Sequence, residues 1–245
     1  MLISKVVRKI REVGVLGTIR LILGTLRLIP ARMRNYSRQR VWEKEEVNFD
    51  RAHGTDTQYS EADDFESDQP EDLYGYDPVR SSTFCRALKA LPIRYEEFVF
   101  VDFGSGKGRA LLLASHFAFK KIIGVEMTPQ LNETAHTNIQ IYKDKRRKCF
   151  DVESICSEAT VFPIPVEKAV FYFFNPFGSN VMSRVLTNLE DSLKRQRREI
   201  YIIYAYPVCR QLLDQAPFLK ILKERKGYDE YTQYSIYVSR PNQTM

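Results

Sequence analysis

Residues 101–109 read Val-Asp-Phe-Gly-Ser-Gly-Lys-Gly-Arg, and this stretch decides the fold. The preceding residues, 98–103, form a short run typical of a buried strand, and residues 109–117 carry the alanines and leucines of a helix. Residues 121–126 and 129–142 repeat this order of strand and helix. The alternation predicts an α/β fold with a doubly wound, mostly parallel sheet and right-handed crossovers.

The glycine spacing of the loop separates three kinds of ligand site. A triphosphate-binding loop needs GxxxxGK[ST], but Gly108 follows Lys107 and Val101 stands where the first glycine is required. A dinucleotide-binding loop needs GxGxxG, and Arg109 occupies the position of its third glycine. What remains is a glycine loop preceded by an acid, Asp102, which can bind a cationic ammonium group instead of a pyrophosphate.

The stretch resembles the first motif of class I S-adenosylmethionine-dependent methyltransferases, and the likeness covers about residues 74–240. In that family the glycine loop passes beneath the methionine and ribose parts of the cofactor, and the acid before it holds the amino group. The resemblance therefore implies S-adenosyl-L-methionine as the cofactor. It implies cofactor-binding roles for Asp102, Gly104, Ser105, Gly106 and Gly108.

Two later acids extend the resemblance. Glu126 ends the second strand, where the family places an acid that accepts both ribose hydroxyls, and a carboxylate has two acceptor oxygens for them. Enzymes that bind NAD use an acid similarly, and a solvated acid at a helix start is the alternative. Glu158, within residues 155–163, stands where the family's adenine loop commonly has Asp; the alternative is a surface acid.

Residues 170–178 read Val-Phe-Tyr-Phe-Phe-Asn-Pro-Phe-Gly and resemble the Asn-Pro-Pro-Tyr signature of amino-group methyltransferases. In that signature an amide or main-chain carbonyl fixes the nucleophilic nitrogen, and an aromatic ring flanks it. The resemblance implies a catalytic group of Asn175, Pro176 and Phe177, with Phe177 in place of the second proline. The alternative is a turn that ends a buried strand.

Residues 76–83 resemble the lead-in of some non-SET lysine methyltransferases. By that likeness we expect Tyr76, Ser81 or Thr83 to close over the cofactor. A helix cap at Ser81 or Ser82 is the alternative.

The remaining pattern completes a sheet of seven strands. We expect helices over 180–193 and 208–215 and strands over 199–205, 218–222 and 233–238. The last two strands leave little room for a crossover helix, so they predict a C-terminal antiparallel hairpin. Such a hairpin distinguishes the class I methyltransferase sheet from the dinucleotide-binding one.

Charge is segregated along the 245 residues. Residues 1–40 carry ten bases and one acid, residues 41–77 carry two bases and thirteen acids, and the whole chain has a net charge of +6. We therefore divide the chain into a basic amphipathic arm (1–40), an acidic flexible tether (41–73) and a methyltransferase domain (74–245).

The arm has the periodicity of an amphipathic helix, but Arg20 and Arg27 make it too short and too polar to span a bilayer or to serve as a secretory signal. Three interpretations stay open: residues 1–35 bind an anionic membrane surface, the helix docks on protein, or it is an organellar transit peptide. We expect a cytoplasmic protein with peripheral membrane attachment.

The metal-binding residue types are scattered. The four cysteines form no CxxC pair and the three histidines no HxH or HxxxH set, so we expect no metal and buried thiols in place of disulfides.

Together these features predict an enzyme that methylates a nitrogen, or another nucleophile, of a protein or small molecule. One alternative is an RNA or DNA methyltransferase, supported by the basic clusters at 146–148 and 194–198. Another is a cofactor-binding or scaffold protein without catalysis.

Overall fold

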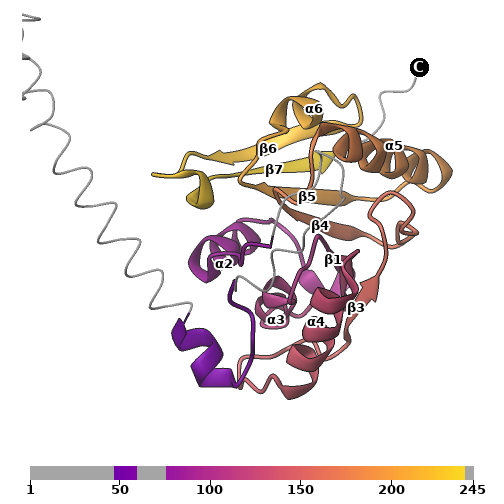
Figure 1. Ribbon diagram of the computed structural model, residues 1–245. Helices are drawn as coiled ribbons and strands as arrows, with labels where there is room; N and C mark the ends of the chain where they lie inside the picture. The colour runs from indigo at the N-terminus through magenta and orange to yellow at the C-terminus, as the bar shows by residue number, and fades with distance from the viewer. Residues whose placement is uncertain (1–46, 60–75, 241–245) are drawn as a thin grey trace, which may run out of the picture. The chain divides into compact units, whose positions relative to one another are not determined.

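The computed structural model describes residues 47–59 and 76–240 (Figure 1). The predicted basic arm and residues 41–46 and 60–73 of the predicted tether lie outside the described residues. Within the described ranges, no helix is both long enough and apolar enough to cross a membrane.

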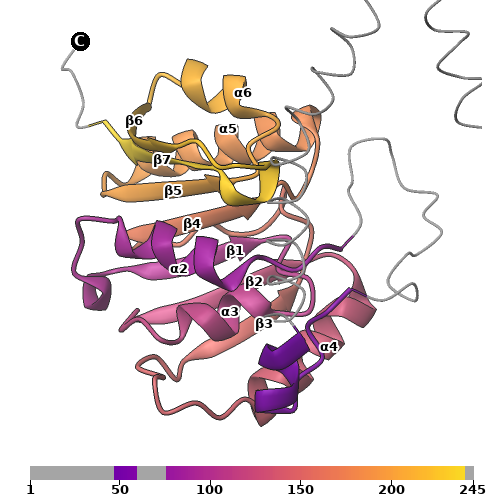
Figure 2. The same ribbon diagram turned by 90° about the vertical axis from the view of Figure 1, so that its left-hand side faces the viewer.

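A seven-stranded sheet forms the centre of the described domain, in the order β3-β2-β1-β4-β5-β7-β6 (Figure 2). Its strands are β1 (Val99–Phe103), β2 (Lys121–Glu126), β3 (Val152–Cys156), β4 (Ala169–Phe174), β5 (Ile200–Ala205), β6 (Leu219–Arg225) and β7 (Tyr234–Ser239). Strands β1 to β5 pair in parallel, and β7 is antiparallel to β5 and β6. The predicted mostly parallel seven-stranded sheet and its C-terminal antiparallel hairpin are therefore confirmed.

Helices cover both faces of the sheet (Figures 1 and 2). They are α2 (Ser81–Lys89), α3 (Arg109–Ala114), α4 (Pro129–Ile141), α5 (Ser179–Arg195) and α6 (Arg210–Gln215), with short 3₁₀ turns η2 (Tyr95–Glu97) and η3 (Glu230–Thr232). Apolar residues of α2 and α3 share one core cluster, and those of α5 and α6 share the cluster on the opposite face. The polar loops at the carboxyl ends of the strands are thereby held between two packed layers.

The central strand β1 explains why the sequence identified the fold so directly. All five of its residues are buried, because parallel strands with helices on both faces read as continuous apolar runs. Val101 and Phe103 face the cluster of α5 and α6, while Phe100 faces that of α2 and α3. Alternation along the strand places Asp102 on the face of Phe100, in register with Tyr172 of β4.

Residues 47–59 do not behave as the flexible tether that we expected over 41–73. Residues 47–53 are helical, Phe49 packs against the core cluster of α2 and α3, and Thr57 is fully buried. The expectation is wrong for this segment because one of its acids, Asp50, is buried and paired with Arg109 of the folded domain.

Two smaller expectations are also settled. All four cysteines lie among the described residues and are free, with Cys149 buried as expected but Cys156 exposed. Helix α2 begins at Ser81 with Arg80 in the N-cap position and no side-chain cap, so the alternative of a Ser81 or Ser82 cap is wrong.

In the described part of the chain, no group of His, Cys, Asp and Glu is arranged to hold a metal ion.

Candidate functional site

The glycine loop turns the chain from β1 into α3 through a backbone that glycine alone adopts readily. Gly104, Gly106 and Gly108 have φ of +74°, +51° and +86°. A Cβ atom at Gly104 would lie 2.6 Å from Cβ of Pro176, and one at Gly106 would overlap the ring of Tyr76. The structure therefore brings together three segments that the sequence analysis selected separately.

Asp102 is a carboxyl buried directly behind this loop. Its residue is 3% exposed, and its pKa is raised well above the ordinary value, mainly by burial and also by the negative charge of Glu126. A carboxyl with a raised pKa destabilises the fold at neutral pH, because it must ionise in surroundings that favour its protonated form. A cation bound beside Asp102 would remove that penalty.

Glu126 ends β2 and faces the same loop. Its Oε2 accepts a hydrogen bond from the Gly106 amide at 2.9 Å, and its Oε1 accepts one from the Thr128 amide at 2.9 Å. Thr128 is the N-cap residue of α4, so Glu126 also lies at the start of a helix, as the alternative interpretation of this acid expected. Each carboxylate oxygen retains a second lone pair, so Glu126 can accept further hydrogen bonds from a ligand.

The Asn-Pro turn follows β4 at the same edge. Asn175 has a left-handed backbone, with φ of +43°, and its Oδ1 atom is buried without a hydrogen-bond partner among the described residues. Phe177, predicted to flank an acceptor, is instead 3% exposed and packs against Phe173 in the core, with ring centroids 6.0 Å apart. An aromatic residue after Asn-Pro can equally well fill a position in the core, and Phe177 does so.

The other predicted residues lie around this centre. Ser105 is buried beneath the loop, where its Oγ would be 2.6 Å from a Cβ at Gly124. Glu158 is exposed in the turn after β3 and accepts a hydrogen bond from Thr160 at 3.3 Å. Ser81 is half-buried and Thr83 buried on α2, so their predicted roles above a cofactor remain predictions.

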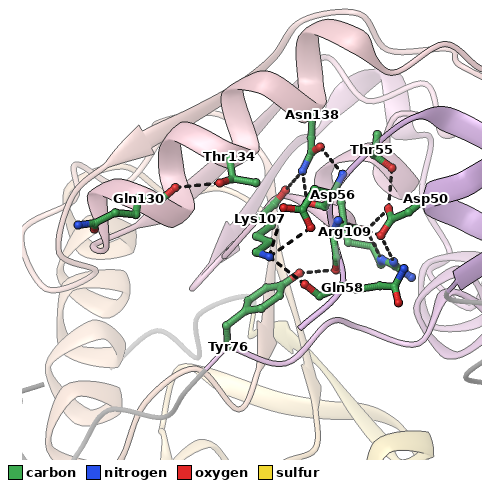
Figure 3. Close-up of polar contacts among 11 residues, drawn as sticks. Asp50, Thr55, Asp56, Gln58, Tyr76, Lys107, Arg109, Gln130, Thr134 and Asn138 are labelled. Atoms are coloured by element: carbon green, nitrogen blue, oxygen red, sulfur yellow. Dashed lines mark hydrogen bonds and ion pairs between the residues drawn. The ribbon is translucent and has the colours of Figure 1, made fainter. Parts of the chain in front are cut away.

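Two bases of the glycine loop are buried and bound to residues 47–59 (Figure 3). The Lys107 Nζ lies 3.2 Å from Asp56 Oδ1 and donates to the Gln58 carbonyl at 2.9 Å. Arg109 Nε donates to the Thr57 hydroxyl at 2.6 Å, and burial lowers the Arg109 pKa to about 10. The glycine loop thus has an N-terminal segment fastened to it.

Asp50 and Asn138 complete this attachment. Asp50 accepts from the hydroxyls of Thr55 and Thr57, from the Thr57 amide at 2.9 Å, and from Arg109 Nη2 at 3.4 Å. The Asn138 amide group donates to the carbonyls of Asp56 and Lys107 at 2.6 and 2.9 Å.

The sequence offered one signal for this network, which the analysis missed. Lys107 and Arg109 stand at the start of helix α3, where the helix dipole disfavours positive charge. Two bases in such a place require acidic partners. The identity of these partners could not be read from the sequence, because Asp56 lies 51 residues before Lys107 and Asp50 lies 59 residues before Arg109.

A second group that the sequence analysis missed lies beside the Asn-Pro turn. Tyr206 follows β5, the strand next to β4, and has φ of +47°. Its ring is 6.4 Å from Phe174 and 5.3 Å from Tyr231, measured between centroids. The carboxyl edge therefore carries an aromatic group next to Asn175.

Comparisons with known proteins give similarity in three-dimensional structure only, since no family model and no curated protein sequence matches the chain. An RNA methyltransferase from Salinibacter ruber, solved with S-adenosyl-L-homocysteine, is 16% identical over 69% of this chain and 95% of its own, with a TM-score of 0.45. An S-adenosylmethionine-dependent methyltransferase from Aquifex aeolicus is 15% identical over 64% and 88%, with a TM-score of 0.46. Magnesium protoporphyrin IX methyltransferase from Synechocystis is 13% identical over 64% and 76%, with a TM-score of 0.43. A function for this chain must therefore be inferred from the residues of the site.

The attachment of residues 47–59 gives a first prediction. Asp50→Asn should lower the free energy of unfolding by about 3 kcal/mol, because it removes the charge opposite the buried Arg109 and turns an amide toward hydrogen-bond donors. Asp56→Asn is the matched control and should cost less than about 1 kcal/mol, because the Asp56 side chain is 70% exposed and Asn can still accept from Lys107. Urea unfolding of both variants measures the difference, and equal losses would contradict it.

Proposed function

We propose that the chain is a class I S-adenosylmethionine-dependent methyltransferase that methylates a nitrogen of a protein or small molecule. The observation that carries the proposal is the meeting of three groups at one sheet edge. These are the buried carboxyl of Asp102, the Glu126 carboxylate against Gly106, and the Asn-Pro turn against Gly104.

The residues present fit the cofactor. The buried Asp102, with its raised pKa, suits the ammonium group of the methionine part, and the free lone pairs of Glu126 suit the two ribose hydroxyls. The missing side chains at Gly104 and Gly106 let Pro176 and Tyr76 pack directly against the loop. When bound, S-adenosylmethionine supplies a methyl group on a positively charged sulfur. Tyr76, Ser81, Thr83 and Glu158 are proposed to contribute further contacts, Tyr76 by closing over Gly106.

Methyl transfer is an in-line displacement, so the protein must align the nucleophile and keep water out. Asn175 is proposed to hold the acceptor nitrogen, since its Oδ1 atom is a buried acceptor that lacks a partner among the described residues. Pro176 fixes that amide against the cofactor side of the site by its contact with Gly104.

A nucleic acid acceptor is less well supported by the two basic clusters. Arg146 is paired with Asp144, and Lys194 with Glu190 and Asp191. Arg198 donates to the carbonyls of Pro165 and Glu167, at 2.6 and 2.9 Å. These three bases are engaged within the domain, whereas Lys148, Arg195 and Arg197 are exposed. The clusters therefore support a nucleic acid acceptor only in part.

Residues 1–35 are proposed to attach the protein to the surface of an anionic membrane from the cytoplasmic side. The support is their charge and their amphipathic pattern. The proposed domain division keeps the arm at 1–40, with residues 47–59 now assigned to the folded domain.

Cofactor binding is the first test. Calorimetry should detect binding of S-adenosylmethionine or S-adenosylhomocysteine to the protein, and Gly106→Ala should weaken it about tenfold or more, because the added methyl group displaces Tyr76. Gly54→Ala is the control: Gly54 also has positive φ, +70°, but a Cβ there meets nothing within 4 Å. It should leave affinity unchanged. Binding of NAD in place of both ligands would overturn the proposal.

The role of Asn175 gives the next prediction. Asn175→Ala should reduce the rate of methyl transfer about a hundredfold while cofactor affinity stays within twofold, because orientation of the acceptor affects the transition state and not cofactor binding. Thr187→Ala, which removes a hydrogen bond to the Ser183 carbonyl on the exposed face of α5, is the control and should affect neither. Equal loss of rate and affinity would make Asn175 a structural turn residue.

The arm can be tested by deletion of residues 1–35. The shortened protein should keep its cofactor affinity but no longer sediment with phosphatidylserine-containing vesicles, since each basic residue near an anionic surface contributes about 1 kcal/mol. Salt should weaken sedimentation of the full-length protein. Full-length protein that stays in the supernatant would exclude the membrane role.

A further inference from the structure

Thr57 is the residue on which the contacts of residues 47–59 converge. It is fully buried, and each of its polar groups has a partner. The amide donates to Asp50 Oδ2 at 2.9 Å, while the hydroxyl donates to Asp50 Oδ1 at 2.7 Å and accepts from Arg109 Nε at 2.6 Å. Both members of a buried ion pair therefore fix the position of Thr57.

The remaining polar group of Thr57, its carbonyl, holds a residue of a different segment. It accepts a hydrogen bond from the Tyr76 hydroxyl at 2.7 Å, and Figure 3 shows the Tyr76 side chain pointing toward residues 47–59. The Lys107 Nζ lies 5.7 Å from the centroid of the same ring, close enough for attraction between a cation and a ring face. Tyr76 is thus held both at its hydroxyl and at its ring.

The ring of Tyr76 fills the space that a side chain at Gly106 would need. The amide of Gly106 donates to Glu126 Oε2 at 2.9 Å. The ring and the carboxylate that we propose for the ribose hydroxyls therefore contact the same residue of the glycine loop. A ring held in this position lies beside the proposed ribose site.

The Asp50–Arg109 pair is better explained by positioning than by stability. The two side chains are only 9% and 1% exposed. Removing such charges from water costs about as much as their attraction returns, so a buried pair adds little stability beyond what apolar residues would give. Hydrogen bonds to charged groups are short and have a defined geometry, and here they are made to Thr57.

We propose that Thr57 is a positioning residue for the cofactor. Asp50 and Arg109 fix the main chain of this residue. The carbonyl of Thr57 then holds the Tyr76 ring over the glycine loop, as a wall of the cofactor site. The inference rests on the proposed function and goes beyond it, because it makes cofactor affinity depend on residues buried behind the loop. Such coupling is reciprocal, so a bound cofactor also stabilises the attachment of residues 47–59.

Affinity for S-adenosylhomocysteine, measured by calorimetry, tests both ends of this connection. Thr57→Val keeps the size of the side chain but removes its hydrogen bonds to Asp50 and Arg109, and should weaken binding about tenfold. Tyr76→Phe keeps the ring but loses the bond to the Thr57 carbonyl, and should weaken binding about fivefold. Thr55→Val is the matched control: it removes a hydroxyl bond of 2.6 Å to the same Asp50 oxygen and should leave affinity unchanged.

The double variant shows whether Thr57 and Tyr76 act through one connection. Thr57→Val combined with Tyr76→Phe should bind about as weakly as the weaker single variant, because both changes break the same link. Losses that multiply, to about fiftyfold, would indicate independent effects and overturn the inference. Wild-type affinity in Tyr76→Phe would also overturn it, as would a Thr55→Val variant that binds as weakly as Thr57→Val.

Hydrogen exchange tests the reciprocal effect in the wild-type protein, where no substitution can disturb folding. Saturating S-adenosylhomocysteine should slow amide exchange in residues 54–58 about fivefold or more, because the ligand opposes their local opening. Helix α6, which packs on the other face of the sheet, is the control and should change little. Equal slowing in both segments, or none in residues 54–58, would contradict the coupling. Failure of the wild-type protein to bind the ligand would instead refute the proposed function on which the inference rests.

Discussion

The turn from β1 into α3 requires three left-handed residues within five positions, and the rest of the carboxyl edge is packed on that turn. Pro176 touches it at Gly104, while Tyr76 and Glu126 touch it at Gly106. A side chain at either glycine would separate these segments. The same absence of side chains that allows them to meet would also allow a ligand to approach the main chain, so one backbone requirement serves both the fold and the proposed cofactor site.

Residues 47–59 show how the domain compensates for charges that the turn buries. Lys107 and Arg109 are almost fully buried at the start of α3, and a polar segment from the N-terminal side provides Asp56 and Asp50 as their partners. Burying either base without an acidic partner would cost several kcal/mol, so the segment that contacts the two bases also has to supply their partners. Polar composition is therefore a poor guide to flexibility where the acids serve buried bases.

The sequence predicted the sheet well and the site in part. Parallel strands buried on both faces, such as β1 and β4, read as continuous apolar runs, so their ends and the loops after them could be placed. Asp102, Gly106 and Glu126 followed from spacing. Tyr206 and Tyr231 did not, because only the pairing of β5 with β4 and the return of the chain after β6 bring them to the end of β4. Phe177 was predicted to flank the acceptor but lies in the core, because an aromatic side chain is suited to both places.

The central claim is that Asp102, the glycine loop and Glu126 form one cofactor site. A crystal structure of the protein soaked with S-adenosylhomocysteine, a demethylated analogue of the proposed methyl donor, tests it most directly. The account predicts the ribose hydroxyls within hydrogen-bond distance of Glu126 and the amino group on the side of Asp102, with the thioether sulfur facing Asn175. Ligand density away from the glycine loop, or no ligand density at a saturating concentration, would contradict it.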